Sequence, residues 1–135
     1  MKRIVVGFDG SDHARKALAR AAEIANGATV AVVSATSPST FMRDPGVSKE
    51  DPADVEARTQ ALDEARKYLE EKGITGQYIT GHGNPADVIV AEAEDSGADL
   101  IIVGTRGHNA ARRVVLGSVS TNVVHHATVD VLVVR

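Results

Sequence analysis

Short apolar runs rich in β-branched residues alternate along this chain with longer segments in which small apolar residues recur at helical spacing. This alternation predicts a parallel β-sheet with helices on both faces and right-handed crossover connections. In such sheets, ligands bind beyond the carboxyl ends of the strands, where the strand order reverses. If the first strand is central, the loops after the first and fourth strands meet at that point. The strands are predicted at residues 3–8, 29–34, 75–80, 98–103 and 129–134.

The predicted helices have recognisable beginnings. Ser11 is expected to cap the first helix, and the dipeptides Asp51-Pro52 and Asn84-Pro85 place a capping side chain before a proline at the first helical position. The last helix is predicted from Ser118 to His126. Residues 35–50, rich in Ser, Thr, Pro and Gly, are predicted to form an irregular surface segment. Glycines are expected to end the first three helices at Gly27, Gly73 and Gly97.

Length, charge and cysteine content limit the classes of function. The 135 residues fit one domain, 1–135, with a single core. A formal net charge of −3 argues against nucleic acid as a partner, which usually requires a basic surface. Cysteine is absent, which suits a reducing compartment. No stretch approaches the roughly 20 apolar residues that span a bilayer, so we expect a cytoplasmic protein that does not enter membranes.

The segment GTRGHNAARRVVLGS follows the most hydrophobic predicted strand and leads into the last helix. Gly104 and Gly107 permit a tight turn, and Gly117 with Ser118 stands where the helix begins. Backbone N–H groups at a helix N-terminus bind phosphates, and glycine lets the backbone approach closely. The spacing therefore predicts an anion site. The chain lacks GxxxxGK[ST], and it lacks GxGxxG after its first strand, so neither a standard P-loop nor a standard dinucleotide fold is expected.

Charged residues flank this predicted anion site. Asp9 follows the first strand and would face the same crevice, where a carboxylate would repel phosphates unless a cation intervened. Magnesium held by one carboxylate, phosphate oxygens and water would remove that repulsion. Asp9 could instead bind a ribose hydroxyl or help to cap the next helix. Arg112 and Arg113 could add positive charge or face solvent.

Four segments together resemble the universal stress protein family, and the resemblance covers essentially the whole chain. The segments are IVVGFDGS, GNPADVIVAEAEDSGADLIIVGTRG, GSVS and VDVLVVR. The spacing of Gly104, Gly107, Gly117 and Ser118 resembles that of the ATP-binding branch of the family. The resemblance implies a Rossmann-like five-stranded parallel open sheet of the adenine nucleotide alpha hydrolase type, with strand order 3-2-1-4-5. It also implies ATP in a cleft of that sheet and a homodimer formed through the last strand.

The resemblance also implies a role for particular residues. Ala35, placed just beyond the second strand, and Val103 would flank the base. Ala35 departs from the pattern, because family members often carry a larger aliphatic residue there, which implies a looser base pocket. Asp9, with Gly7 and Phe8 beside it, would face the ribose, the phosphates or a magnesium ion. The phosphates would be surrounded by Gly104, Gly107, Gly117, Ser118, Val119 and Ser120.

Three functions fit these residues. The first is a nucleotide-binding regulatory protein for ATP with magnesium, acting in stress adaptation through a protein partner that the sequence does not identify. The second is a slow ATPase or phosphotransferase, ranked lower because no residue is evident that would orient water. The third is a binder of another adenine nucleotide, such as AMP or cyclic AMP. The apolar final strand favours a homodimer in each case, because pairing removes an exposed sheet edge.

Overall fold

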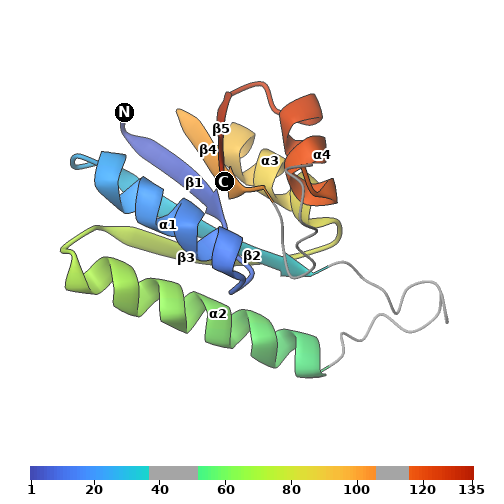
Figure 1. Cartoon of the computed structure of the whole chain (residues 1–135), viewed down its shortest axis with the longest axis horizontal. Coiled ribbons are helices and arrows are strands. Elements are labelled where there is room, and N and C mark those ends of the chain that lie inside the picture. The colour runs from blue at the N-terminus through green and yellow to red at the C-terminus, as the bar shows by residue number, and fades with distance from the viewer. Residues whose placement is uncertain (37–51, 106–115) are drawn as a thin grey trace, which may run out of the picture.

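The computed structural model describes residues 1–36, 52–105 and 116–135. Strands and helices alternate along the chain in the predicted order (Figure 1). The predicted caps are confirmed for two helices: Ser11 Oγ accepts a hydrogen bond from the N–H of Ala14, and Asn84 Oδ1 accepts one from the N–H of Ala86. The elements are β1 Arg3–Gly7, α1 Asp12–Ile24, β2 Thr29–Thr36, α2 Pro52–Glu71, β3 Gly76–His82, α3 Pro85–Ser96, β4 Leu100–Gly104, α4 Ser118–His126 and β5 Asp130–Val134.

The five strands form one sheet in the order β3-β2-β1-β4-β5, and every neighbouring pair is parallel. The predicted fold class and strand order are therefore confirmed. β1 is central: its Val5 pairs with Ala31 of β2 on one side and with Ile101 of β4 on the other. The chain order reverses at β1, so the carboxyl ends of β1 and β4 lie next to each other, as predicted.

Helices cover both faces of the sheet (Figure 1). Successive residues of a strand point to opposite faces, and β1 follows this rule. Its Ile4 and Val6 pack into a cluster with α1 and α2, whereas Val5 packs into a second cluster with α3 and α4. All three side chains are fully buried. Among the described residues, no helix has the length and apolar character needed to cross a membrane.

The observed boundaries correct two details of the prediction. β2 continues to Thr36, so Ala35 lies within the strand, where it pairs with Gly81 of β3, and not beyond its end. β1 stops at Gly7, so Phe8 and Asp9 belong to the turn that leads into α1. The cap predicted at Asp51 lies outside the described residues. The predicted position of the polar third strand near an edge is confirmed, because β3 ends the sheet on one side.

One side chain joins the beginnings of two neighbouring strands. The Asp99 carboxylate, just before β4, accepts hydrogen bonds from the backbone N–H groups of Lys2 at 2.7 Å and Arg3 at 3.0 Å. These two bonds, with that from Lys2 the larger influence, lower the pKa of Asp99 below its ordinary value. The contact fixes the start of the central strand at the end of the sheet opposite to the cavity described below.

Candidate nucleotide site

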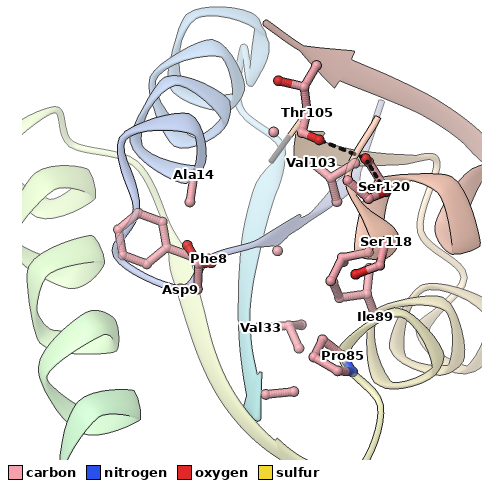
Figure 2. A pocket seen from close by; sticks show the side chains of 15 residues that line it. Phe8, Asp9, Ala14, Val33, Pro85, Ile89, Val103, Thr105, Ser118 and Ser120 are labelled. Atoms are coloured by element: carbon pink, nitrogen blue, oxygen red, sulfur yellow. Dashed lines mark hydrogen bonds between the residues drawn. The ribbon is translucent and has the colours of Figure 1, made fainter. Parts of the chain in front are cut away.

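A cavity of about 410 Å³ opens at the carboxyl ends of β1, β2 and β4 (Figure 2). Every predicted site residue that the structure describes lines it. Gly7, Phe8 and Asp9 come from the end of β1 and the following turn, and Ala35 comes from β2. The remaining lining residues among those predicted are Val103 and Gly104 of β4 and Gly117, Ser118, Val119 and Ser120 at the start of α4. Gly107, Arg112 and Arg113 lie outside the described residues.

The N-terminus of α4 forms one end of the cavity and differs from the other described helix starts. Ser11 caps α1 and Asn84 caps α3, but among the described residues no side chain caps α4. Its N-cap is Gly117, and the first backbone N–H groups of a helix have no partner within the helix. The first turn of α4 therefore offers donors, aided by the helix dipole, to an anion in the cavity.

The opposite end of the cavity is apolar. Val33 and Ala35 of β2 face Pro85 at the first position of α3, and Ile89 follows one turn later (Figure 2). The glycine at the end of β1 permits this packing. A Cβ atom at Gly7 would lie 2.6 Å from Ile89 Cδ1, so the Ile89 side chain would have to move to accommodate one. This end can accept a flat apolar group such as a nucleobase, while the α4 end can accept phosphates.

Asp9 lines the cavity beside Phe8, across from Ser118 and Ser120, and is exposed (Figure 2). Its Oδ1 accepts a hydrogen bond of 2.9 Å from the N–H of Ser11. The carboxylate therefore helps to order the turn before α1, whereas the helix cap considered for Asp9 is provided by Ser11. Within the described residues, no group of three or more His, Cys, Asp or Glu side chains could hold a metal ion. A single carboxylate fits a magnesium ion that takes its other ligands from phosphates and water.

The sequence reading missed five lining residues: Ala14, Val33, Pro85, Ile89 and Thr105. Two had a signal in the sequence. Val33 is two residues from Ala35 on the same strand and so shares its face, and Thr105 follows Gly104 directly. Pro85 and Ile89 are four residues apart on one face of a helix, but only the strand order brings that helix to the cavity.

The carbonyl oxygen of Thr105 connects the end of β4 to the first turn of α4 at one end of the cavity. It accepts a hydrogen bond of 2.6 Å from the N–H of Gly117. It also accepts one of 3.0 Å from Ser120 Oγ, which Figure 2 shows as a dashed line. Ser120 is buried, and its hydroxyl also contacts the carbonyl of Gly117. The end of β4 and the start of α4 are thus held together directly beneath the cavity.

The fold and this cavity define an α/β protein of the doubly wound type with a cavity at the strand order reversal, where ligands bind in such folds. The chain belongs to the universal stress protein family: the model of that family matches residues 1–135. The resemblance found in the sequence is therefore confirmed.

Curated relatives and solved structures agree with this assignment. A universal stress protein of Thermus aquaticus is 37% identical over 142 residues, covering 99% of this chain and 98% of its own. The universal stress protein of Archaeoglobus fulgidus, solved in complex with dAMP, is 28% identical, has a TM-score of 0.78, and covers 100% of this chain and 98% of its own. A universal stress protein solved in complex with cAMP is 30% identical, has a TM-score of 0.76, and covers 99% of this chain and 97% of its own.

Proposed function

We propose that this protein binds ATP with magnesium and acts as a nucleotide-dependent regulator in stress adaptation, in the cytoplasm, through a partner protein. The observation that carries the proposal is the uncapped first turn of α4, which lines a cavity whose other end is apolar. An adenine ring at Val33, Ala35 and Pro85 would leave its phosphates pointing toward that turn. Related proteins solved in complex with dAMP and with cAMP support an adenine nucleotide as the ligand.

Different residues would contact different parts of the nucleotide. The N–H groups of Ser118, Val119 and Ser120 would donate to phosphate oxygens, and the Ser118 hydroxyl would add a further donor. Asp9 would hold magnesium together with the phosphates or, alternatively, bind the ribose. Gly107, which is part of the predicted glycine spacing, is also proposed to help surround the phosphates.

Binding with slow or absent hydrolysis is favoured over a committed enzyme. Phosphoryl transfer needs a group that positions the attacking nucleophile. Among the described lining residues, Asp9 alone has a titratable side chain, and its carboxylate already accepts a hydrogen bond from Ser11. A phosphate-release assay with the Asp9→Ala variant as control separates the two functions. Release that disappears in the variant would identify a slow ATPase.

A homodimer through β5 is part of the proposal. β5 ends the sheet and pairs only with β4 among the described strands. Its Val131, Leu132 and Val133 are only partly buried. Pairing the same strand from two subunits would cover this edge in a closed arrangement. Multi-angle light scattering should therefore give twice the mass of the chain, and a monomer at all concentrations would refute this part.

Isothermal titration with ATP and magnesium tests the site. Gly117 has φ −69° and ψ 174°, which valine can also adopt, so the Gly117→Val variant should remain folded. Its side chain would occupy the space for phosphates, and we expect affinity to fall at least about tenfold, equivalent to about 1.4 kcal/mol. Thr128→Val is the control, because Thr128 is exposed and does not line the cavity. A folded Gly117→Val protein that binds ATP as tightly as wild type would contradict the proposal.

Titrations of the wild type with ATP, AMP and cyclic AMP decide which nucleotide is preferred. Preference for ATP is expected if the turn at α4 holds more than one phosphate. If AMP or cyclic AMP binds more tightly than ATP, that nucleotide takes the place of ATP in the proposal, and the assignment of the site is unchanged.

A further inference from the structure

A buried threonine beside the cavity makes a side-chain contact that the proposed function does not use. Thr105 is only 4% exposed, and its Oγ1 lies 3.1 Å from Nδ1 of His13. His13 belongs to the first turn of α1, two residues after the capping residue Ser11. The contact joins residues that are 92 positions apart in the chain. It therefore connects the start of α1 to the end of β4.

The backbone of Thr105 carries this connection to two further elements. Its N–H donates to the carbonyl of Val134 at the end of β5, at 3.0 Å. Its carbonyl accepts from Gly117 N–H and Ser120 Oγ in the first turn of α4. One residue thus contacts α1, α4 and β5 at the end of the cavity where an anion would lie.

The geometry makes the side-chain contact a constraint on the backbone. Threonine is branched at Cβ and has few accessible χ1 rotamers, so fixing Oγ1 also restricts the orientation of the peptide groups on either side. The backbone of His13 cannot shift easily toward β4, because the end of β4 packs directly against it: a Cβ atom at Gly104 would lie 2.6 Å from the His13 carbonyl oxygen. The direction of the Thr105 carbonyl, and with it the position of Gly117, therefore depends on the contact with His13.

We propose that Thr105 and His13 form a positioning pair that sets the affinity for nucleotide phosphates by holding the first turn of α4 at the cavity. The inference rests on the proposed function, since it concerns the same site. Thr105 lines the cavity, but its hydroxyl is directed to His13, so the pair should act on the phosphates through the donors of α4. It should therefore affect ligands that carry phosphates and leave binding of the nucleoside moiety unchanged.

Competition binding against a fluorescent ATP analogue, with unlabelled ATP and adenosine as competitors, tests this selectivity. The Thr105→Val variant keeps the shape of the side chain and removes the hydroxyl. We expect it to bind ATP roughly five- to twentyfold more weakly, the effect of one or two hydrogen bonds held out of position. Adenosine affinity should stay within about twofold of wild type. The Thr105→Ser variant restores the hydroxyl and should recover most of the loss.

The matched control is Thr128→Val. Thr128 also donates its hydroxyl across elements, to Glu94 Oε1 at 3.0 Å, but neither residue lines the cavity. This variant should leave both affinities unchanged. Thermal unfolding of both variants compares their losses of stability. The ATP affinity of Thr128→Val then shows whether loss of a tertiary hydrogen bond alone alters binding.

A double-mutant cycle identifies the contact itself. His13→Ala should weaken ATP binding to a similar degree, and the double variant should be no weaker than either single variant if both changes remove one interaction. If Thr105→Val does not fold, His13→Ala alone provides the comparison of ATP with adenosine. Equal loss of ATP and adenosine would show a general structural role and overturn the inference. So would unchanged ATP affinity in folded variants.

The same measurements separate the two proposals. If wild type binds ATP and the variants behave like wild type, only the positioning role fails. If wild type binds neither ATP nor the fluorescent analogue, the proposed function fails and this inference falls with it.

Discussion

Replacing Gly104 by alanine would introduce a methyl group where the end of β4 touches the first turn of α1. The new Cβ atom would lie 2.6 Å from the carbonyl oxygen of His13 and 2.7 Å from its carbonyl carbon, whereas ordinary contact begins at 3.4 Å. These are backbone atoms, so rotation of a side chain cannot relieve the overlap. α1 and β4 must separate locally, and overpacking of this kind costs about 1–3 kcal/mol of unfolding free energy.

Thermal unfolding followed by circular dichroism measures this cost. For a domain of this size, we expect the midpoint of Gly104→Ala to fall by about 4–12 °C. Gly73→Ala is the contrast for binding: its Cβ atom meets nothing within 4 Å, but its φ of +69° gives a comparable loss of stability, about 1–2 kcal/mol, far from the cavity. Gly104→Ala should also weaken ATP binding, because Gly104 lines the cavity, whereas Gly73→Ala should not. A Gly104→Ala protein with the wild-type midpoint and wild-type affinity would refute the reasoning.

Three further substitutions have expected outcomes. Ser120→Ala removes a buried hydroxyl bonded to the Thr105 carbonyl and should lower the unfolding free energy by about 0.5–1.5 kcal/mol in urea titrations. Ile102→Ala truncates a fully buried side chain in β4 and should cost about 2–5 kcal/mol in the same assay. Asp99→Asn tests the lowered pKa of the Asp99 carboxyl. The ionised carboxylate stabilises the fold above about pH 4, the pKa of an aspartate in the unfolded chain. This stabilisation is lost as the pH falls toward the pKa of Asp99 in the folded protein. The midpoint difference between Asp99→Asn and wild type should therefore shrink in acid, and a difference that is constant with pH would exclude this contribution.

The fold could be predicted because its signals are local and agree with one another. Side chains that cap helices, at Ser11 and Asn84, precede apolar segments of the right period, and the helix predicted over Ser118–His126 has those boundaries. The end of β2 could not be predicted in the same way. Ala35 and Thr36 continue the strand because Gly81 and His82 of β3 pair with them, and such tertiary pairing outweighs local preference.

Some residues of the candidate site could be predicted from the sequence, and others could not. Residues that follow strand ends, such as Asp9 and Gly104, could be assigned to the cleft because parallel strands end at one edge of the sheet. Ile89 and His13 could not, because their places depend on how α3 and α1 pack across that edge. Nothing in the sequence near position 13 indicates a contact with a residue 92 positions away.

The central claim is that the first turn of α4 receives the phosphates of an adenine nucleotide. Backbone amide NMR of the uniformly ¹⁵N-labelled protein, titrated with ATP and magnesium, tests this claim most directly. The largest shifts are expected at the amides of Ser118, Val119 and Ser120, with further shifts at Gly104 and Thr105, which share the cavity. Adenosine should shift the amides of Val33 and Ala35 and leave those of α4 largely in place. Saturable ATP binding that leaves the α4 amides unshifted would contradict the claim, as would the absence of any shift at millimolar ATP.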